Sequence, residues 1–171
     1  MALARVCAAA LVVLAAWPLV ALADDPPLVD HQPVACTIAE KPMQLCATIS
    51  DDSAVAKASL YFRRAGEDYY SFVVMEFTGL NYCGTIPAIR ADKGNSIDYY
   101  IQAVDDQYQP NRTSTYQMNV QAEGVCEFPP IQKDAAKAAA IQVYATNKKQ
   151  GKKLDDAFQQ SGVSFVPVVA K

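Results

Sequence analysis

Histidine and tryptophan are nearly absent from this 171-residue chain, which has one of each. A single histidine, His31, gives no basis for a Cys-His or Ser-His-Asp catalytic set. No two cysteines have the Cys-x-x-Cys spacing of a zinc or redox site. The sequence also lacks a Gly-x-Ser-x-Gly motif and a glycine-rich phosphate loop. We therefore predict that the protein is not an enzyme and needs no cofactor for catalysis.

Positive charge is scarce over most of the chain. Residues 24–131 contain 7 Lys and Arg against 15 Asp and Glu, a balance of -8, whereas residues 132–171 contain 7 against 3, a balance of +4. An acidic body argues against binding to nucleic acid, which requires a clustered basic face. Two interpretations of the basic tail are open: a solvated segment, or one that docks on its own domain or on an acidic partner.

The first residues have the pattern of a secretory signal. Arg5 precedes an apolar run over residues 6–22, and Ala21-Leu22-Ala23 then stands before two acidic residues. The alternative is an uncleaved membrane anchor, because about 20 apolar residues span a bilayer. Pro18 and the small-residue site favour cleavage. We predict a signal peptide over residues 1–23, an exported protein that is periplasmic or secreted, and no membrane span after cleavage.

After residue 23 the sequence has four cysteines, which are Cys36, Cys46, Cys83 and Cys126. An exported protein meets an oxidising compartment, where thiols pair. We therefore predict two structural disulfides, and the spacing alone allows three connectivities.

Alternation of apolar and polar residues runs from about residue 34 to residue 121, interrupted by turn residues such as Ser50-Asp51-Asp52-Ser53. This pattern predicts seven strands, over residues 34–38, 44–50, 57–64, 69–77, 80–87, 96–105 and 113–121. Seven short strands without long helices between them indicate an all-β, antiparallel sandwich over residues 34–127. Residues 24–33, with three prolines, are expected to form an extended leader.

Strand parity predicts the core. In the second strand Leu45, Ala47 and Ile49 alternate with polar residues, and in the sixth strand Ile97, Tyr99 and Ile101 do the same. Cys46 and Cys83 occupy outward positions on the second and fifth strands.

Several segments resemble a known family: Ser50-Asp51-Asp52, Leu60-Tyr61-Phe62-Arg63, the run from Tyr82 to Ala88 and the run from Asp98 to Asp105. They look like the fibronectin type III-like or immunoglobulin-like modules of bacterial exported proteins, over about residues 29–122. In such modules the second and fifth strands are neighbours in one sheet. Together with parity, the resemblance implies that Cys46 pairs with Cys83 on the outer side of a sheet. Cys36 and Cys126 then join the two ends of the domain.

The composition changes after Pro129, and we predict a separate region over residues 128–171. Residues 131–146 are rich in alanine and follow a proline pair, which favours a helix. Residues 148–153 form a basic loop, residues 154–160 suit one or two helical turns, and residues 163–169 are β-prone.

An acidic cluster is expected at one pole of such a sandwich. The topology brings the leader, with Asp30 and His31, near two turns whose carboxylates are Asp51, Asp52, Asp105 and Asp106. Converging carboxylates are a candidate Ca²⁺ site, since Ca²⁺ takes six to eight oxygen ligands. The alternative is that these aspartates bond the amides of their own turns.

A second candidate surface lies on the outer face of the sheet that holds the third and sixth strands. Tyr61, Arg63, Asp98, Tyr100 and Gln102 are expected there side by side. Tyrosines among polar residues suit a sugar or a peptide, and the alternative is ordinary cross-strand pairing.

These observations lead to one functional hypothesis with two alternatives. We expect an exported, non-catalytic immunoglobulin-like module that binds a protein or a cell-surface component, and not nucleic acid. The alternatives are a carbohydrate-binding accessory protein and a calcium-stabilised adhesion-type module.

Overall fold

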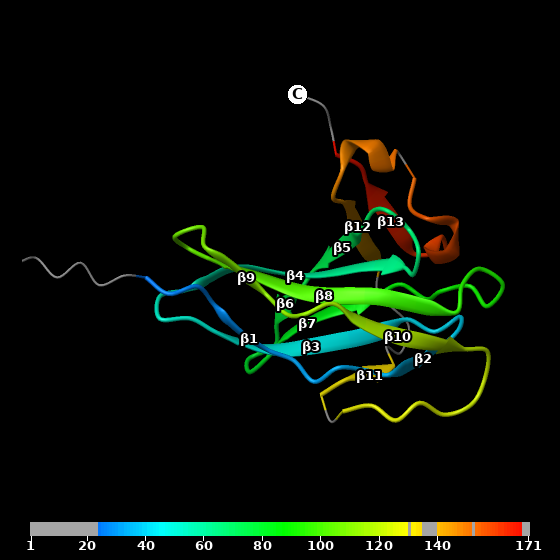
Figure 1. Ribbon diagram of the computed structural model, residues 1–171, viewed down its shortest axis with the longest axis horizontal. Helices are drawn as coiled ribbons and strands as arrows, with labels where there is room; N and C mark the ends of the chain where they lie inside the picture. Colours follow the sequence, from blue (N-terminus) through cyan, green and yellow to red (C-terminus); the bar gives the residue numbers. More distant parts are fainter. Residues whose placement is uncertain (1–23, 130, 135–139, 152, 169–171) are drawn as a thin grey trace, which may run out of the picture.

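The computed structural model describes residues 24–129, 131–134, 140–151 and 153–168, and almost all regular structure within them is β-strand (Figure 1). The expected signal over residues 1–23 lies outside the described residues, as do residues 135–139 within the expected helix. In the described part of the chain, no helix has the length and apolar character needed to cross a membrane.

Two sheets face each other. In the first, the strand order is β1-β3-β7-β6, and β11 pairs with β3 beyond the end of β1. The strands of this sheet are β1 (Leu28–Asp30), β3 (Met43–Ser50), β6 (Glu76–Phe77), β7 (Tyr82–Ile86) and β11 (Lys133–Asp134).

The second sheet is larger, with the order β13-β12-β5-β4-β8-β10-β2, and β9 pairs with β8. Its strands are β2 (Cys36–Ile38), β4 (Val55–Arg64), β5 (Ser71–Val74), β8 (Ser96–Asp105), β9 (Pro110–Arg112), β10 (Tyr116–Gln121), β12 (Ile141–Ala145) and β13 (Val163–Val166). Two short 3₁₀ turns, η1 (Lys148–Gln150) and η2 (Asp156–Phe158), connect β12 to β13.

The core between the sheets follows the predicted alternation. Along β8 every second residue is buried, and so are inward residues of its neighbour β4 and of β3 in the other sheet. Leu45, Leu60, Phe62, Tyr99 and Ile101 are completely buried. Each large apolar side chain of this kind contributes about 1.5–3 kcal/mol to folding, so this core is the main source of stability.

A strand lies within each of the seven expected ranges, but the expected count of seven is wrong, because β1 in the expected leader, β9, β11, β12 and β13 are further strands. Two other corrections concern the expected strands themselves. The expected strand over residues 69–77 is divided into β5 and β6 at Met75, whose N–H donates to the carbonyl of Ala58 (3.0 Å), and the two halves belong to different sheets. The sheets are mostly antiparallel, but β2 pairs with β10 and β12 pairs with β13 in parallel. The chain crosses from β1 in the first sheet to β2 in the second.

The helix expected over residues 131–146 is wrong where the chain is described. Ile141–Ala145 is strand β12, which lies antiparallel to β5 and parallel to β13. The edge of β5 offers unpaired backbone groups, and Ile141, Val143 and Ala145 alternate toward the core. Pairing with this edge outweighs the helix propensity of the alanines. The tail therefore extends the second sheet (Figure 1).

Both disulfides are the expected pairs. Cys46 and Cys83 are direct partners in the register of β3 and β7, and Cys36 is bonded to Cys126. The expected solvent exposure of Cys46 is wrong, because its side chain is buried. The side-chain amide of Gln132 takes the place of a strand backbone beside Cys46. Its oxygen accepts from the N–H of Cys46 (2.6 Å), and its nitrogen donates to the carbonyl of Cys46 (2.9 Å).

Candidate functional site

The outer face of the second sheet carries a row of stacked aromatic rings. Tyr61 and Tyr100 are opposite in the register of β4 and β8, and their rings stack with centroids 4.6 Å apart. On the other side of Tyr61 the row continues to Phe72 (5.2 Å) and then to Tyr144 (5.1 Å). We call Tyr144, Phe72, Tyr61 and Tyr100 the aromatic row; it crosses β12, β5, β4 and β8.

Cations cover much of the remaining ring surface. The guanidinium of Arg112 lies 4.8 Å from the centroid of Tyr100, and the ammonium of Lys57 lies 4.8 Å from that of Phe72. A sugar binds an aromatic ring through an open ring face. The rings of Phe72, Tyr61 and Tyr100 lie against neighbouring rings or cations, so this arrangement favours a role in stabilising the sheet over sugar binding.

The other predicted residues of this surface lie where parity placed them. Arg63 forms an ion pair with Asp98 (3.1 Å), and its guanidinium covers the ring of Tyr70. Gln102 is opposite Ser59 and Arg112 in the register. Burial raises the pKa of Tyr61 and of Tyr100, so both hydroxyls remain neutral. The sequence interpretation missed Phe72 and Tyr144, although Tyr144 alternates with buried residues in a period of two.

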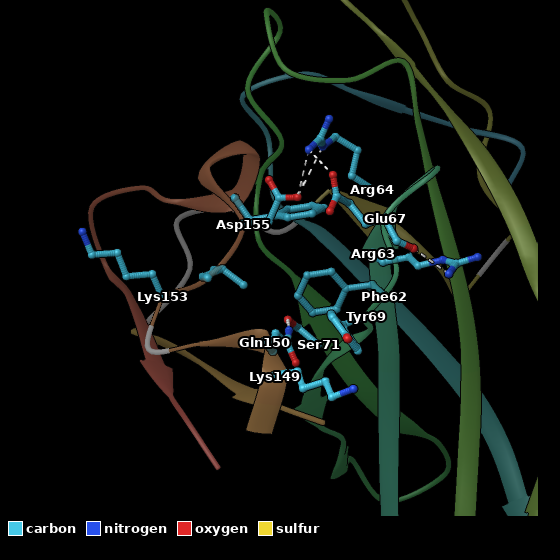
Figure 2. Close-up of a pocket in the computed structure, with 12 residues that line it drawn as sticks. Phe62, Arg63, Arg64, Glu67, Tyr69, Ser71, Lys149, Gln150, Lys153 and Asp155 are labelled. Carbon is cyan, nitrogen blue, oxygen red and sulfur yellow. Dashed lines mark hydrogen bonds and ion pairs between the residues drawn. The ribbon is translucent and has the colours of Figure 1, made fainter. Parts of the chain in front are cut away.

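At one end of the second sheet, a pocket of about 200 Å³ lies between β4, the turn that follows it and the tail (Figure 2). Phe62 and Phe158 line its apolar side, with ring centroids 5.0 Å apart. Arg64 binds both acidic groups of the pocket, Glu67 and Asp155, and Figure 2 shows these ion pairs together at one wall.

The polar groups of this pocket hold the tail against the sandwich. Arg64 joins the β4–β5 turn to the tail through Asp155, and Gln150 donates to the hydroxyl of Ser71. Lys153 extends away from the other lining residues in Figure 2. The pocket thus lies at the boundary between the tail and the sandwich, and its acidic side chains, Glu67 and Asp155, are both paired with Arg64.

The opposite end of the molecule, which we call the loop pole, carries four of the eight large apolar side chains that are exposed in the described part of the chain. The register places the β3–β4, β6–β7 and β8–β9 turns there together with the segment before β1, because Leu28 pairs with Ser50 and Val55 with Asp105. Leu80 is 83% exposed and Tyr108 is 86% exposed. Phe77 and Leu28 are also exposed at this pole. Tyr108 lies in the turn between β8 and β9 and has a positive φ of 66°, an uncommon conformation for a residue other than glycine.

Aspartates lie on turns of the same pole, and two of them bond the amides of their own turns, which is the alternative that the sequence offers to a Ca²⁺ site. Asp51 accepts hydrogen bonds from the N–H of Ser53 (3.0 Å) and from its hydroxyl (2.8 Å), and Asp106 also contacts that hydroxyl (2.8 Å). Asp105 is completely buried and accepts from the N–H of Gln109 (2.7 Å). The turns of the loop pole are therefore built around carboxylates.

Two carboxylate oxygens at the pole have no partner. Oδ2 of Asp105 and Oδ2 of Asp51 are buried and make no hydrogen bond. An unpaired buried polar group costs about 1–3 kcal/mol, and a charged one costs more. Among the residues that the structure describes, no three His, Cys, Asp or Glu side chains are grouped to hold a metal ion.

His31 does not join these carboxylates. It is buried beside β3 and β8, where its Nδ1 donates to the carbonyl of Cys46 (2.8 Å) and its Nε2 contacts the hydroxyl of Tyr99 (3.1 Å). Because β1 runs along β3 away from the loop pole, His31 lies too far along β3 to join Asp51 and Asp105 as expected.

Comparisons with known proteins do not identify a family for this chain. No protein-family model matches the chain, and no curated protein matches it. An engineered protein of known crystal structure is similar with a TM-score of 0.42 and 12% identity, over 56% of this chain and 20% of that one. A chimeric titin Z1Z2 that carries a peptide from decorin is similar with a TM-score of 0.36 and 21% identity, over 60% of this chain and 100% of the other. At these TM-scores the similarities carry no argument about this chain.

Proposed function

We propose that this chain is an exported, non-catalytic, immunoglobulin-like binding module, and that its loop pole recognises a basic, partly apolar segment of another protein. The observation that carries the proposal is the grouping of exposed Leu28, Phe77, Leu80 and Tyr108 at the end of the molecule that also holds the aspartates.

The apolar tips give the proposed site its contact area. A soluble protein buries most of its large apolar side chains, and exposed ones that gather at one end are typical of an interaction surface. Leu80 and Tyr108 come from turns that belong to different sheets. The two sheets thus present their turns to the same partner, as rigid supports present binding loops in many proteins.

The charge of the loop pole indicates the chemistry of the partner. Asp51, Asp52 and Asp106 lie on its turns, and none of the ion pairs in the described part of the chain involves them. Negative groups around an apolar centre steer a positively charged surface into place. A partner segment with Lys or Arg beside apolar residues fits both features.

The two disulfides support export, because thiols pair in oxidising compartments. The two-sheet arrangement, with β3 and β7 adjacent in one sheet and β4, β8 and β10 in the other, supports an immunoglobulin-like topology. A sandwich of this kind does not specify its function, so the proposal depends on the loop pole and not on the fold.

The test is site-specific photo-crosslinking in the cells that make the protein. A photoreactive residue replaces Leu80 or Tyr108 in two variants, and replaces Tyr100 in a control variant at the aromatic row. We expect the same partner to be captured from positions 80 and 108 and not from position 100. Capture at position 100 alone would contradict the loop pole as the binding site and favour the outer sheet face.

The captured partner is then purified, and its affinity is measured for the wild-type protein, for Leu80→Ser and for Tyr108→Ser. Truncation of an anchor residue at the centre of an interface costs about 2 kcal/mol or more, so we expect affinity to fall about tenfold or more in each variant. Asp68→Asn, in the β4–β5 turn at the other end, is the matched surface control. Binding should weaken as salt is raised. Unchanged affinity in both variants would disprove the proposal.

A further inference from the structure

Gln109 forms hydrogen bonds to two aspartates, Asp24 near the start of the expected mature chain and the buried Asp105. Its backbone N–H donates to Oδ1 of Asp105 (2.7 Å), and its side-chain amide donates to the carbonyl of Asp24 (2.9 Å) and to Oδ2 of Asp24 (2.8 Å). The backbone of Asp24 is therefore held beside the turn that contains Asp105, at the start of the expected mature chain.

The carboxylates in this part of the loop pole have no cationic partner in the described part of the chain. Asp105 is completely buried with Oδ2 unpaired, and Oδ2 of Asp51 is also buried and unpaired. Within the described residues, no lysine or arginine forms an ion pair with Asp24, Asp51 or Asp105. Buried charges in proteins are normally paired, so the arrangement calls for a cation.

We propose that hydrolysis of the Ala23–Asp24 peptide bond supplies this cation, by placing the new α-ammonium of Asp24 against the buried carboxylate of Asp105. In the cleavage, catalysed by a peptidase of the export machinery, water adds across the bond. Ala23 keeps the new carboxylate, and Asp24 keeps the amine, which takes up a proton at neutral pH. Removal of the signal then gives the buried carboxylate of Asp105 a partner, and the exposed aspartates of the loop pole keep their negative charge.

An ammonium fits this place better than a metal ion. Ca²⁺ takes six to eight oxygen ligands, whereas the described residues contain no three carboxylates or imidazoles grouped for a metal. An ammonium has three donors and is satisfied by a few acceptors. The pKa of the Asp24 carboxyl is raised, first by burial and then by the negative charges of Asp52, Asp105 and Asp51, which agrees with a place that lacks positive charge.

The first experiment determines the first residue of the mature chain and then displaces the α-ammonium from its place. Intact mass of the exported protein is expected to give a chain that begins at Asp24. A variant with Gly-Ser inserted between Ala23 and Asp24 keeps the cleavage site and displaces the ammonium by two residues. We expect the inserted variant to unfold at a lower temperature than the wild-type protein.

Asp105→Asn tests whether this difference comes from the proposed pair. In the Asp105→Asn background the Gly-Ser insertion should have no effect on the unfolding temperature, because the displaced charge has lost its partner. In the Asp68→Asn background, at the far end of the molecule, the insertion should keep its full effect. An insertion that is equally destabilising with Asn at 105, or has no effect at all, would overturn the proposal, as would a mature chain that begins elsewhere.

A second readout does not depend on stability. The pKa of the α-amino group, measured by NMR titration, should be higher than the ordinary range of about 7.7–8.0, by about one unit, which is about 1.4 kcal/mol. The stabilisation is then complete below pH about 7.7 and is lost as the pH rises through the raised value. In Asp105→Asn the pKa should return toward the ordinary range. Added Ca²⁺ that stabilised the wild-type and inserted proteins equally would show that a metal ion is the cation, against the proposal.

Discussion

The central strands of the sandwich and the strands of the tail are held in different ways. Strand β8 has ten residues and hydrogen-bonds to β4 over its whole length. Strand β12 has five residues and meets β5 at only two register positions, through Tyr144 and Ala145. The sandwich is thus joined by long ladders, whereas the tail must be held to it mainly by side chains.

The largest fully buried side chain in the described part of the tail is that of Phe158. Phe158, in η2, is almost completely buried, and its ring contacts Phe62 of β4 edge to face. Leu154 and Ala157 are buried beside it and belong to the same core as the sandwich. The tail is part of the core at this point, although its backbone pairing is short.

The largest expected effect follows from Phe158→Ala. Truncation of a buried phenylalanine costs about 3–5 kcal/mol of unfolding free energy. Leu60→Ala, in the centre of the sandwich, is the matched variant at about 2–5 kcal/mol. If the tail and the sandwich form one unit, both variants unfold in a single transition in urea, monitored by tyrosine fluorescence and circular dichroism.

Different unfolding curves for Phe158→Ala and Leu60→Ala would contradict the expectation that the tail and the sandwich unfold together. A separate early transition in Phe158→Ala, absent from Leu60→Ala, would show that the tail unfolds alone and that only side chains attach it. A single transition with a small change for Phe158→Ala would contradict the expected contribution of this ring.

The same contrast explains what could be predicted from the sequence. The sandwich core was predictable, because residues such as Leu45 and Ile101 alternate over whole strands and one face is buried. The pairing of Cys46 with Cys83 followed from parity and the family resemblance, since both residues face outward on adjacent strands.

The tail was not predictable by the same means. Its alanines favour a helix in isolation, and only the unpaired edge of β5 makes residues 141–145 a strand. Part of the loop pole was predictable, because Asp51 and Asp105 lie at the same end as expected. The exposure of Leu80 and Tyr108 was not, because it depends on turn conformations that the alternation of apolar and polar residues does not encode.

A second test concerns the N-terminal segment, which is also attached by side chains. Nδ1–H of His31 donates to the carbonyl of Cys46, and the hydroxyl of Tyr99 accepts from Val34 N–H (2.9 Å) and so donates to Nε2. Burial raises the pKa of Tyr99 to about 12, so this donor stays neutral. We expect His31→Leu to lose about 1–3 kcal/mol at pH 7, because it leaves buried partners unpaired.

Acid should weaken the same attachment. The pKa of His31 is lowered from 6.5, first by burial, while the Cys46 carbonyl and the charge of Asp30 act in the opposite direction. Below pH 6.5 the unfolded chain takes up a proton that the folded chain resists, so stability falls as the pH drops from 7 toward 5. His31→Gln is the control, because it keeps a donor and an acceptor and does not titrate. Parallel urea titrations across this pH range would contradict the expectation if both proteins lost stability equally.

The smallest effect compares the same interaction in the two regions. The Tyr61–Tyr100 stack lies within the sandwich, and the Phe72–Tyr144 stack joins it to the tail, with similar interplanar angles of 6° and 17°. Double-mutant cycles to alanine should give each pair about 0.5–1.5 kcal/mol of coupling. In the Phe158→Ala background, where the tail has lost this core side chain, the Phe72–Tyr144 coupling should fall while the Tyr61–Tyr100 coupling remains. Equal persistence of both would mean that β12 stays on the sheet without Phe158, and that backbone pairing is enough to hold the tail.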